Sequence, residues 1–103
     1  MFVLYVLEGC PYCERAKELL RSESCKYETV IVPNDMKIKT QYKKKYGMNS
    51  FPMIFVERER NHYLKLGGCS DLEEYIEIAK NIKNTHLAMD NLYAVYENMY
   101  SRK

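Results

Sequence analysis

The stretch FVLYVLEGCPYC, residues 2–13, places two cysteines two residues apart, directly after an apolar run. Phe2 to Val6 is apolar and β-prone throughout, which predicts a strand covered on both faces. From Cys13 to Ser24 apolar residues recur at helical spacing. Pro11 suits the first position of that helix, where its missing N–H costs nothing. The stretch therefore predicts a strand, a short turn, and a helix with Cys10 at its N-cap.

The rest of the chain alternates between β-prone runs and helical patterns. Gly47 can end the second helix, and Ser70 with Glu73 fits a capping box at the start of the third. The later elements that we expect are a strand over Tyr27–Val32, a helix capped by Asn34 or Asp35 that runs to Tyr46, a hairpin of strands Met53–Val56 and Tyr63–Leu66 with a turn-like tip over 57–61, a helix capped by Ser70 or Asp71 that runs to Ile82, and a further helix over Leu87–Tyr100.

This order predicts an α/β fold with a four-stranded mixed sheet flanked by helices, βαβαββα plus an extra C-terminal helix. A right-handed crossover joins the first two strands. The cysteine pair then lies at the carboxyl end of the first strand, where open α/β sheets place their sites. We assign residues 1–84 to one domain and 85–103 to a helical extension packed on it, and we expect a monomer.

Bulk properties exclude several classes of protein. The chain has 103 residues, enough for one hydrophobic core, and a net charge of +2, too small to indicate nucleic acid or a membrane surface as partner. Its longest apolar run, residues 1–7, is far too short to cross a bilayer. Of the four cysteines, the close pair would close too short a loop to stabilise a secreted domain. We therefore expect a cytoplasmic protein with one reactive pair.

The cysteine pair suits thiol–disulfide exchange. The amides of a helix N-terminus stabilise a thiolate, the reactive form of Cys10, and a cation such as Lys17 or Arg15 would add to this. Cys13, inside the first turn, suits the role of resolving thiol. The alternative is half of a zinc site, but no second Cys-x-x-Cys follows, and the remaining candidate ligands are Cys25, Cys69, His62 and His86. We favour redox chemistry and expect no metal.

Three motifs together resemble a dithiol glutaredoxin of the thioredoxin fold. These are Cys10-Pro11-Tyr12-Cys13, a proline at the start of the third strand, and Gly67-Gly68-Cys69-Ser70-Asp71-Leu72 before the last core helix. The resemblance covers about Phe2 to Ile82. It implies a glutathione-dependent oxidoreductase that reduces protein disulfides and glutathione mixed disulfides, with disulfide-containing or glutathionylated proteins as partners and ribonucleotide reductase as one candidate.

The resemblance also implies the site residues. Cys10 attacks the mixed disulfide, and Cys13 is needed only for dithiol reduction. Pro52, cis in relatives, leaves the backbone of Phe51 able to pair with the cysteinyl part of glutathione. Relatives usually have Val where this chain has Phe51, a bulkier side chain that could narrow the groove. The full set implied for glutathione is Tyr12, Lys39, Phe51, Pro52, Gly68, Cys69, Ser70 and Asp71.

Physical arguments support part of this set. Glycine lets the backbone approach a ligand, and the amides of Cys69 and Ser70 at a helix start can hold the γ-glutamyl carboxylate, with Asp71 receiving the ammonium. The alternative is a plain glycine turn. Lys39 falls where relatives bind the glycyl carboxylate, although the surrounding lysines are typical of a solvated helix face. Cys69 itself is expected to be a small buried residue.

Two other functions stay open. An iron–sulfur carrier would hold a [2Fe–2S] cluster between two chains and two glutathiones through Cys10, but relatives that do so usually have Gly where this chain has Pro11, and Cys13 also weighs against it. A thioredoxin-like reductase would need Cys10 and Cys13 equally.

Overall fold

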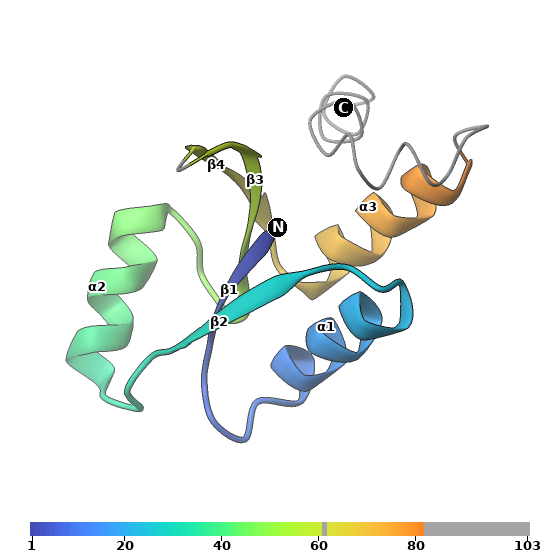
Figure 1. The fold of residues 1–103 in the computed structure, drawn as a ribbon. Helices are drawn as coiled ribbons and strands as arrows, with labels where there is room; N and C mark the ends of the chain where they lie inside the picture. The colour runs from blue at the N-terminus through green and yellow to red at the C-terminus, as the bar shows by residue number, and fades with distance from the viewer. Residues whose placement is uncertain (61, 82–103) are drawn as a thin grey trace.

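The computed structural model describes residues 1–60 and 62–81 and has the predicted order of elements (Figure 1). The elements are β1 (Phe2–Val6), α1 (Pro11–Ser22), β2 (Tyr27–Ile31), α2 (Met36–Tyr46), β3 (Met53–Glu59), β4 (His62–Gly67) and α3 (Cys69–Asn81). The tail helix and the 85–103 extension expected from the sequence lie outside the described residues. No helix among the described residues is long and apolar enough to cross a membrane.

The four strands form one mixed sheet in the order β2-β1-β3-β4. β1 pairs parallel with β2 and antiparallel with β3, which pairs antiparallel with β4. Figure 1 shows α1 and α3 on one side of this sheet and α2 on the other. The predicted α/β class and mixed sheet are confirmed, and the connection from β1 through α1 brings the cysteine pair to the carboxyl end of β1.

The two faces of the sheet are covered unequally. Phe2, Leu4 and Val6 of β1 are buried beneath α1 and α3, where the Phe2 ring meets Tyr75 edge-on at 5.5 Å between ring centroids. The alternate residues Val3 and Tyr5 are only half-buried. The expectation that β1 is covered on both faces is therefore only half right. On the less covered face, Tyr5 packs against Tyr42 and Tyr46 of α2 and against Phe55 of β3.

The residues predicted to begin and end α2 do so in the structure. Asp35 is the N-cap, and its Oδ1 accepts hydrogen bonds from the amides of Lys37 (3.0 Å) and Ile38 (3.1 Å). Gly47 ends the helix with a left-handed φ of 63°. Both ends of this helix satisfy their own backbone groups.

Several boundaries differ from the prediction; β2 ends and β4 begins and ends one residue away from the expected positions, and the larger differences are in α1, β3 and α3. α1 ends at Ser22 rather than Ser24, because Ser24 takes a positive φ of 56° that leaves the helix. β3 runs to Glu59 instead of Val56, since backbone pairing of Glu57 with Tyr63 extends the ladder beyond the apolar residues. α3 begins at Cys69, two or three residues before the helix start that a Ser70 or Asp71 cap would give.

Candidate active site at the ends of α1 and α3

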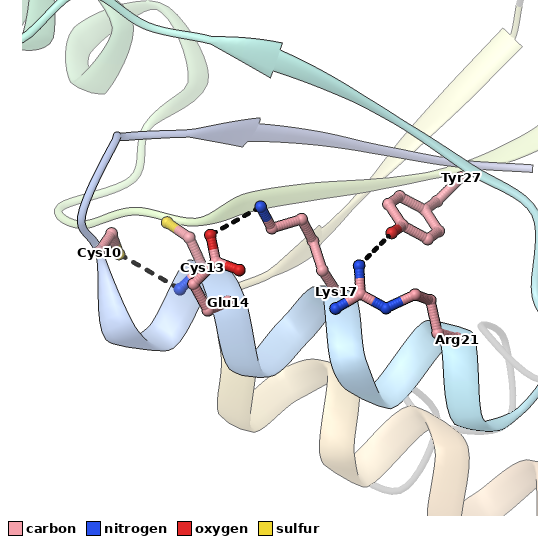
Figure 2. Close-up of polar contacts among 6 residues, drawn as sticks. All are labelled: Cys10, Cys13, Glu14, Lys17, Arg21 and Tyr27. Carbon is pink, nitrogen blue, oxygen red and sulfur yellow. Dashed lines mark hydrogen bonds and ion pairs between the residues drawn. The ribbon is translucent and has the colours of Figure 1, made fainter.

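The first thiol stands at the N-terminus of α1. Cys10 is the N-cap in an extended conformation, and its Sγ accepts a hydrogen bond from the Cys13 amide at 3.2 Å (Figure 2). Its side chain is partly exposed. The sulfur thus takes the position in which a capping side chain satisfies an orphan amide of the first turn. The Cys13 N–H and the positive end of the α1 dipole therefore both point at this sulfur.

The second thiol lies behind the first, in the core. Cys13 is 1% exposed. Burial raises the pKa of Cys13 to about 12, and the hydrogen bond and negative charge of Cys10 add to that rise. A backbone hydrogen bond from Leu7 and the charge of Lys17 oppose it in part. Cys13 therefore stays protonated at neutral pH, and only Cys10 is placed to attack an external disulfide.

The start of β3 forms one wall beside Cys10. The Phe51–Pro52 peptide bond is cis, as the resemblance implied. The Phe51 carbonyl oxygen lies 4.0 Å from Sγ of Cys10, which donates to it. The Phe51 side chain is 8% exposed, so its bulk is taken up largely by the core. A thiol joined to Cys10 would therefore lie beside the Phe51 backbone.

The N-terminus of α3 forms the opposite wall. The carbonyl of Gly68 accepts from the Leu72 amide at 3.1 Å, which puts Gly68 in the N-cap position. Asp71 reaches back, and its Oδ2 accepts from the Gly68 amide at 2.9 Å. This is the acid arm of a capping box, three residues along from the cap. The prediction that Ser70 or Asp71 caps this helix was wrong, because the two glycines let the helix begin earlier.

The turn into α3 requires glycine at Gly67. Its φ is 135°, a conformation that L side chains rarely adopt, and a Cβ there would collide with the Asp71 carboxylate. Gly68 differs, since a Cβ at that position would lie 3.8 Å from the Pro52 carbonyl oxygen, an ordinary contact. Gly68 supplies no side chain to accept hydrogen bonds from the first-turn amides, which suits that end of α3 to an anion.

A groove of about 470 Å³ runs between these walls. Tyr12, 67% exposed, stands at its rim. The groove gathers all but one of the residues that the resemblance implies for glutathione; its lining is Tyr12, Ser50, Phe51, Pro52, Gly68, Cys69, Ser70, Asp71 and Glu73. The exception is Lys39 on α2, whose Nζ bonds Oδ1 of Asn34 at 2.9 Å and which is not part of this lining.

Two lining residues, Ser50 and Glu73, were not predicted. Ser50 precedes the Phe-Pro pair and could have been included by adjacency. Glu73 was assigned to a capping box; instead its Oε1 lies 3.1 Å from Nε of Arg15 and accepts from Sγ of Cys69 at 3.7 Å. The Arg15 contact holds the pKa of Glu73 below its usual range. No local pattern could show this pairing, since the two residues are 58 positions apart.

The two remaining thiols, Cys69 and Cys25, lie outside the Cys-x-x-Cys pair. Cys69 is buried, as expected, and burial and the neighbouring Glu73 raise its pKa. Cys25 is half-buried, and burial raises its pKa to about 11, with a contribution from Glu23. Within residues 1–60 and 62–81, no three His, Cys, Asp or Glu side chains are grouped so that they could hold a metal ion.

The sequence matches the family model described as Glutaredoxin over residues 2–60. Among curated proteins, it is 36% identical over 72 residues to Glutaredoxin 1 of Rickettsia typhi, a match that covers 68% of this chain and 64% of that protein. It is 32% identical over 69 residues to Glutaredoxin 3 of Escherichia coli K12, covering 67% of this chain and 77% of that protein.

Solved structures agree with the fold. The solution structure of glutaredoxin from Brucella melitensis is 29% identical with a TM-score of 0.58, covering 74% of this chain and 77% of that one. A crystal structure of a buckwheat glutaredoxin–glutathione complex is 20% identical with a TM-score of 0.62, covering 84% of this chain and 77% of that one. At that identity, the second match concerns the fold alone.

Proposed function

This chain belongs to the glutaredoxin family, whose members are thiol–disulfide oxidoreductases, and we propose that it reduces glutathione mixed disulfides and protein disulfides with glutathione as the reductant. The observation that carries this proposal is the position of Cys10. Its partly exposed sulfur caps α1 and accepts a hydrogen bond from the Cys13 amide, while the groove near it is lined by Gly68, Cys69 and Ser70 at the start of α3. Cys10 does not itself line the groove, but its sulfur lies beside Phe51, which lines the groove together with the first residues of α3.

The proposed chemistry uses two exchanges at one sulfur. The Cys10 thiolate attacks the glutathione sulfur of a mixed disulfide, the S–S bond breaks, and the substrate leaves as a thiolate that takes a proton from solvent. A second glutathione thiolate then attacks the glutathione sulfur on Cys10, which releases oxidised glutathione and restores the Cys10 thiolate. Each mixed disulfide reduced consumes one free glutathione thiol, and the oxidised glutathione released holds that sulfur and the glutathione sulfur of the substrate.

The walls of the groove suit the tripeptide. The Phe51 backbone lies beside the Cys10 sulfur, where the cysteinyl part of glutathione would pair with it. The amides of Cys69 and Ser70 would hold the γ-glutamyl carboxylate, and Asp71 would receive the ammonium. Tyr12 at the rim would cover the peptide. Lys39 stays a proposed contact for the glycyl carboxylate, and reaching the ligand would require it to leave Asn34. A buckwheat glutaredoxin of the same fold was crystallised in complex with glutathione.

The proposal is tested with a small glutathione mixed disulfide, reduced glutathione, glutathione reductase and NADPH, following NADPH oxidation. Cys10→Ser should abolish activity, because serine cannot form the mixed disulfide. Cys13→Ser should retain much of it, since only Cys10 exchanges with glutathione. Equal loss in both variants would instead favour a thioredoxin-like reductase, and no activity in the wild type would refute the proposal.

The partners follow from the same chemistry. We propose glutathionylated or disulfide-containing proteins as substrates, ribonucleotide reductase among them, in a reducing cytoplasm where the chain acts as a monomer. Nothing in the net charge of +2 attracts nucleic acid or a membrane surface. Sedimentation of the reduced protein with and without glutathione tests the monomer, and a glutathione-dependent dimer with visible absorption after anaerobic iron reconstitution would favour the cluster carrier instead.

A further inference from the structure

Lys17 lies on α1 one helical turn beyond Cys13, so that the two side chains share a face of the helix. Although it is a lysine, its side chain is only 22% exposed, and its Nζ lies 2.7 Å from Oε1 of Glu14. Figure 2 shows that this ammonium and the Cys13 sulfur both lie on the sheet side of α1. The cation that the sequence suggested for Cys10 is therefore held near the second thiol.

The resolving reaction presents a physical difficulty at Cys13. To displace a protein thiol from Cys10, the sulfur of Cys13 must react as a thiolate, yet it is 1% exposed and lies among apolar side chains. Burial is the largest cause that raises the pKa of Cys13, whereas the Leu7 backbone and the Lys17 ammonium lower it. Lys17 is the one cationic side chain among the groups that act on this sulfur.

The effects that set the pKa of Cys13 change when Cys10 forms the mixed disulfide. Two of the causes that raise the pKa of Cys13 are the hydrogen bond and the negative charge of Cys10. Both disappear once Cys10 is joined to another sulfur and is no longer a thiolate. Burial then remains as the opposing effect, with Lys17 and Leu7 against it. The cation therefore matters most in the mixed-disulfide state, when Cys13 must react.

We propose that Lys17 is a positioning residue for the resolving step, where its ammonium, restrained by Glu14, stabilises the Cys13 thiolate that attacks Cys10. This inference rests on the proposed function, and it names a residue that assists the reaction in which both Cys10 and Cys13 take part. Arg21, one turn further along α1, is not among the groups that act on the pKa of Cys13, and its guanidinium Nη1 donates to the Tyr27 hydroxyl at 3.0 Å (Figure 2).

The step balances without another reactant. The Cys13 thiolate attacks Sγ of Cys10, a sulfur–sulfur bond forms between them, and the bond from Cys10 to the bound thiol breaks. The electron pair of that bond leaves with the departing thiolate, which takes from solvent the proton that Cys13 lost. The two enzyme thiols are oxidised to a disulfide and the substrate disulfide is reduced to thiols.

The test follows one turnover of the full chain. Reduced protein is mixed with oxidised glutathione, quenched in acid at intervals, alkylated, digested with trypsin and weighed by mass spectrometry. Cleavage after Arg15 yields peptide 1–15, which carries Cys10 and Cys13 but neither Cys25 nor Cys69. Its mass separates the free dithiol, the glutathione adduct and the internal disulfide, so formation and resolution of the adduct give separate rate constants.

Lys17→Met, which keeps the apolar stem and removes the charge, should slow resolution. Raising a thiol pKa by one unit removes most of its thiolate but makes the remainder more nucleophilic, so each unit costs about threefold in rate. We therefore expect resolution to slow by about threefold, with adduct formation unchanged. The pH profile of resolution should move to higher pH, and Lys17→Arg should restore both.

Arg21→Met is the matched control and should leave both rate constants as in the wild type. Equal resolution rates in Lys17→Met and wild type would overturn the inference, as would a loss that Lys17→Arg does not restore while both variants show wild-type circular dichroism. If the wild type formed no adduct at all, the proposed function would fail first, and the two failures are therefore distinct.

Discussion

The N-termini of α2 and α3 lie on opposite sides of one sheet and are capped in different ways. At α2, the Asp35 carboxylate accepts from the amides of Lys37 and Ile38, the second and third residues of the helix. At α3, the equivalent N-cap is Gly68, which has no side chain to accept the corresponding amides. The Asp35 side chain satisfies two first-turn amides of α2, whereas at α3 we propose that a ligand carboxylate accepts from the first-turn amides.

The first-turn chemistry of α1 is intermediate between these two. Its N-cap side chain is the Cys10 sulfur, which accepts from the Cys13 amide at 3.2 Å and is also the proposed nucleophile. A capping group that satisfies the helix and reacts with substrate ties the reactivity of the site to local helix geometry. The comparison teaches that helix ends which stabilise the fold are capped by side chains, while those that build the site are capped by glycine or by the reactive atom.

The largest expected effect comes from giving α3 the cap that α2 has. In Gly68→Asp, the new carboxylate would accept the amides of Ser70 and Asp71 and repel the γ-glutamyl carboxylate. We expect the KM for glutathione to rise at least about tenfold, equivalent to about 1.4 kcal/mol. Gly68→Ala is the control, because its Cβ meets only an ordinary contact 3.8 Å from the Pro52 carbonyl oxygen. Equal KM values for the two variants would show that the ligand does not use these amides.

The reverse change at α2 should affect stability and leave the chemistry intact. Asp35→Ala removes the acceptor of two amide hydrogen bonds, and the free energy of unfolding should fall by about 1 kcal/mol. In a domain of this size the Tm should drop by about 4–8 °C. Turnover in the mixed-disulfide assay, measured well below the Tm, should not change. A loss of turnover without a loss of stability would break the distinction between the two helix ends.

A last effect concerns the pKa values of two thiols, the buried Cys13 and the half-buried Cys25. Burial raises the pKa of Cys13 to about 12 and that of Cys25 to about 11, above the ordinary value of 9.0. As pH rises past about 9, the unfolded chain loses these protons first, so the unfolded state binds fewer protons and stability falls between pH 9 and pH 11.

Urea unfolding of reduced protein at pH 8 and pH 10 measures this fall. Cys25→Ala removes one of the buried thiols without touching the groove, so the variant should lose less stability than the wild type over this interval. An equal loss in both proteins would mean that Cys25 keeps an ordinary pKa in the folded state.

Much of the fold was predictable because its signals are local. The alternation of apolar runs and helical patterns gave the order of elements, and Asp35 and Gly47 marked both ends of α2. Errors occurred where two local signals compete. Asp71 has the chemistry of an N-cap, yet its carboxylate reaches back to the Gly68 amide from inside the helix. β3 runs past its apolar residues because the pairing partner β4, and not its own side chains, sets its length.

The candidate site likewise has features set by neighbouring residues and features set by long-range contacts. By itself the sequence determined that one thiol caps a helix and the other follows inside its first turn, because capping and helical spacing depend on residues only a few positions apart. Only the tertiary structure decided what surrounds those sulfurs. The Phe51 carbonyl, 41 residues from Cys10, stands beside it, and Glu73 holds Arg15 across 58 residues, which leaves Lys17 as the cation acting on Cys13. Such contacts depend on how the whole sheet and its helices pack, and no short pattern in the chain encodes that packing.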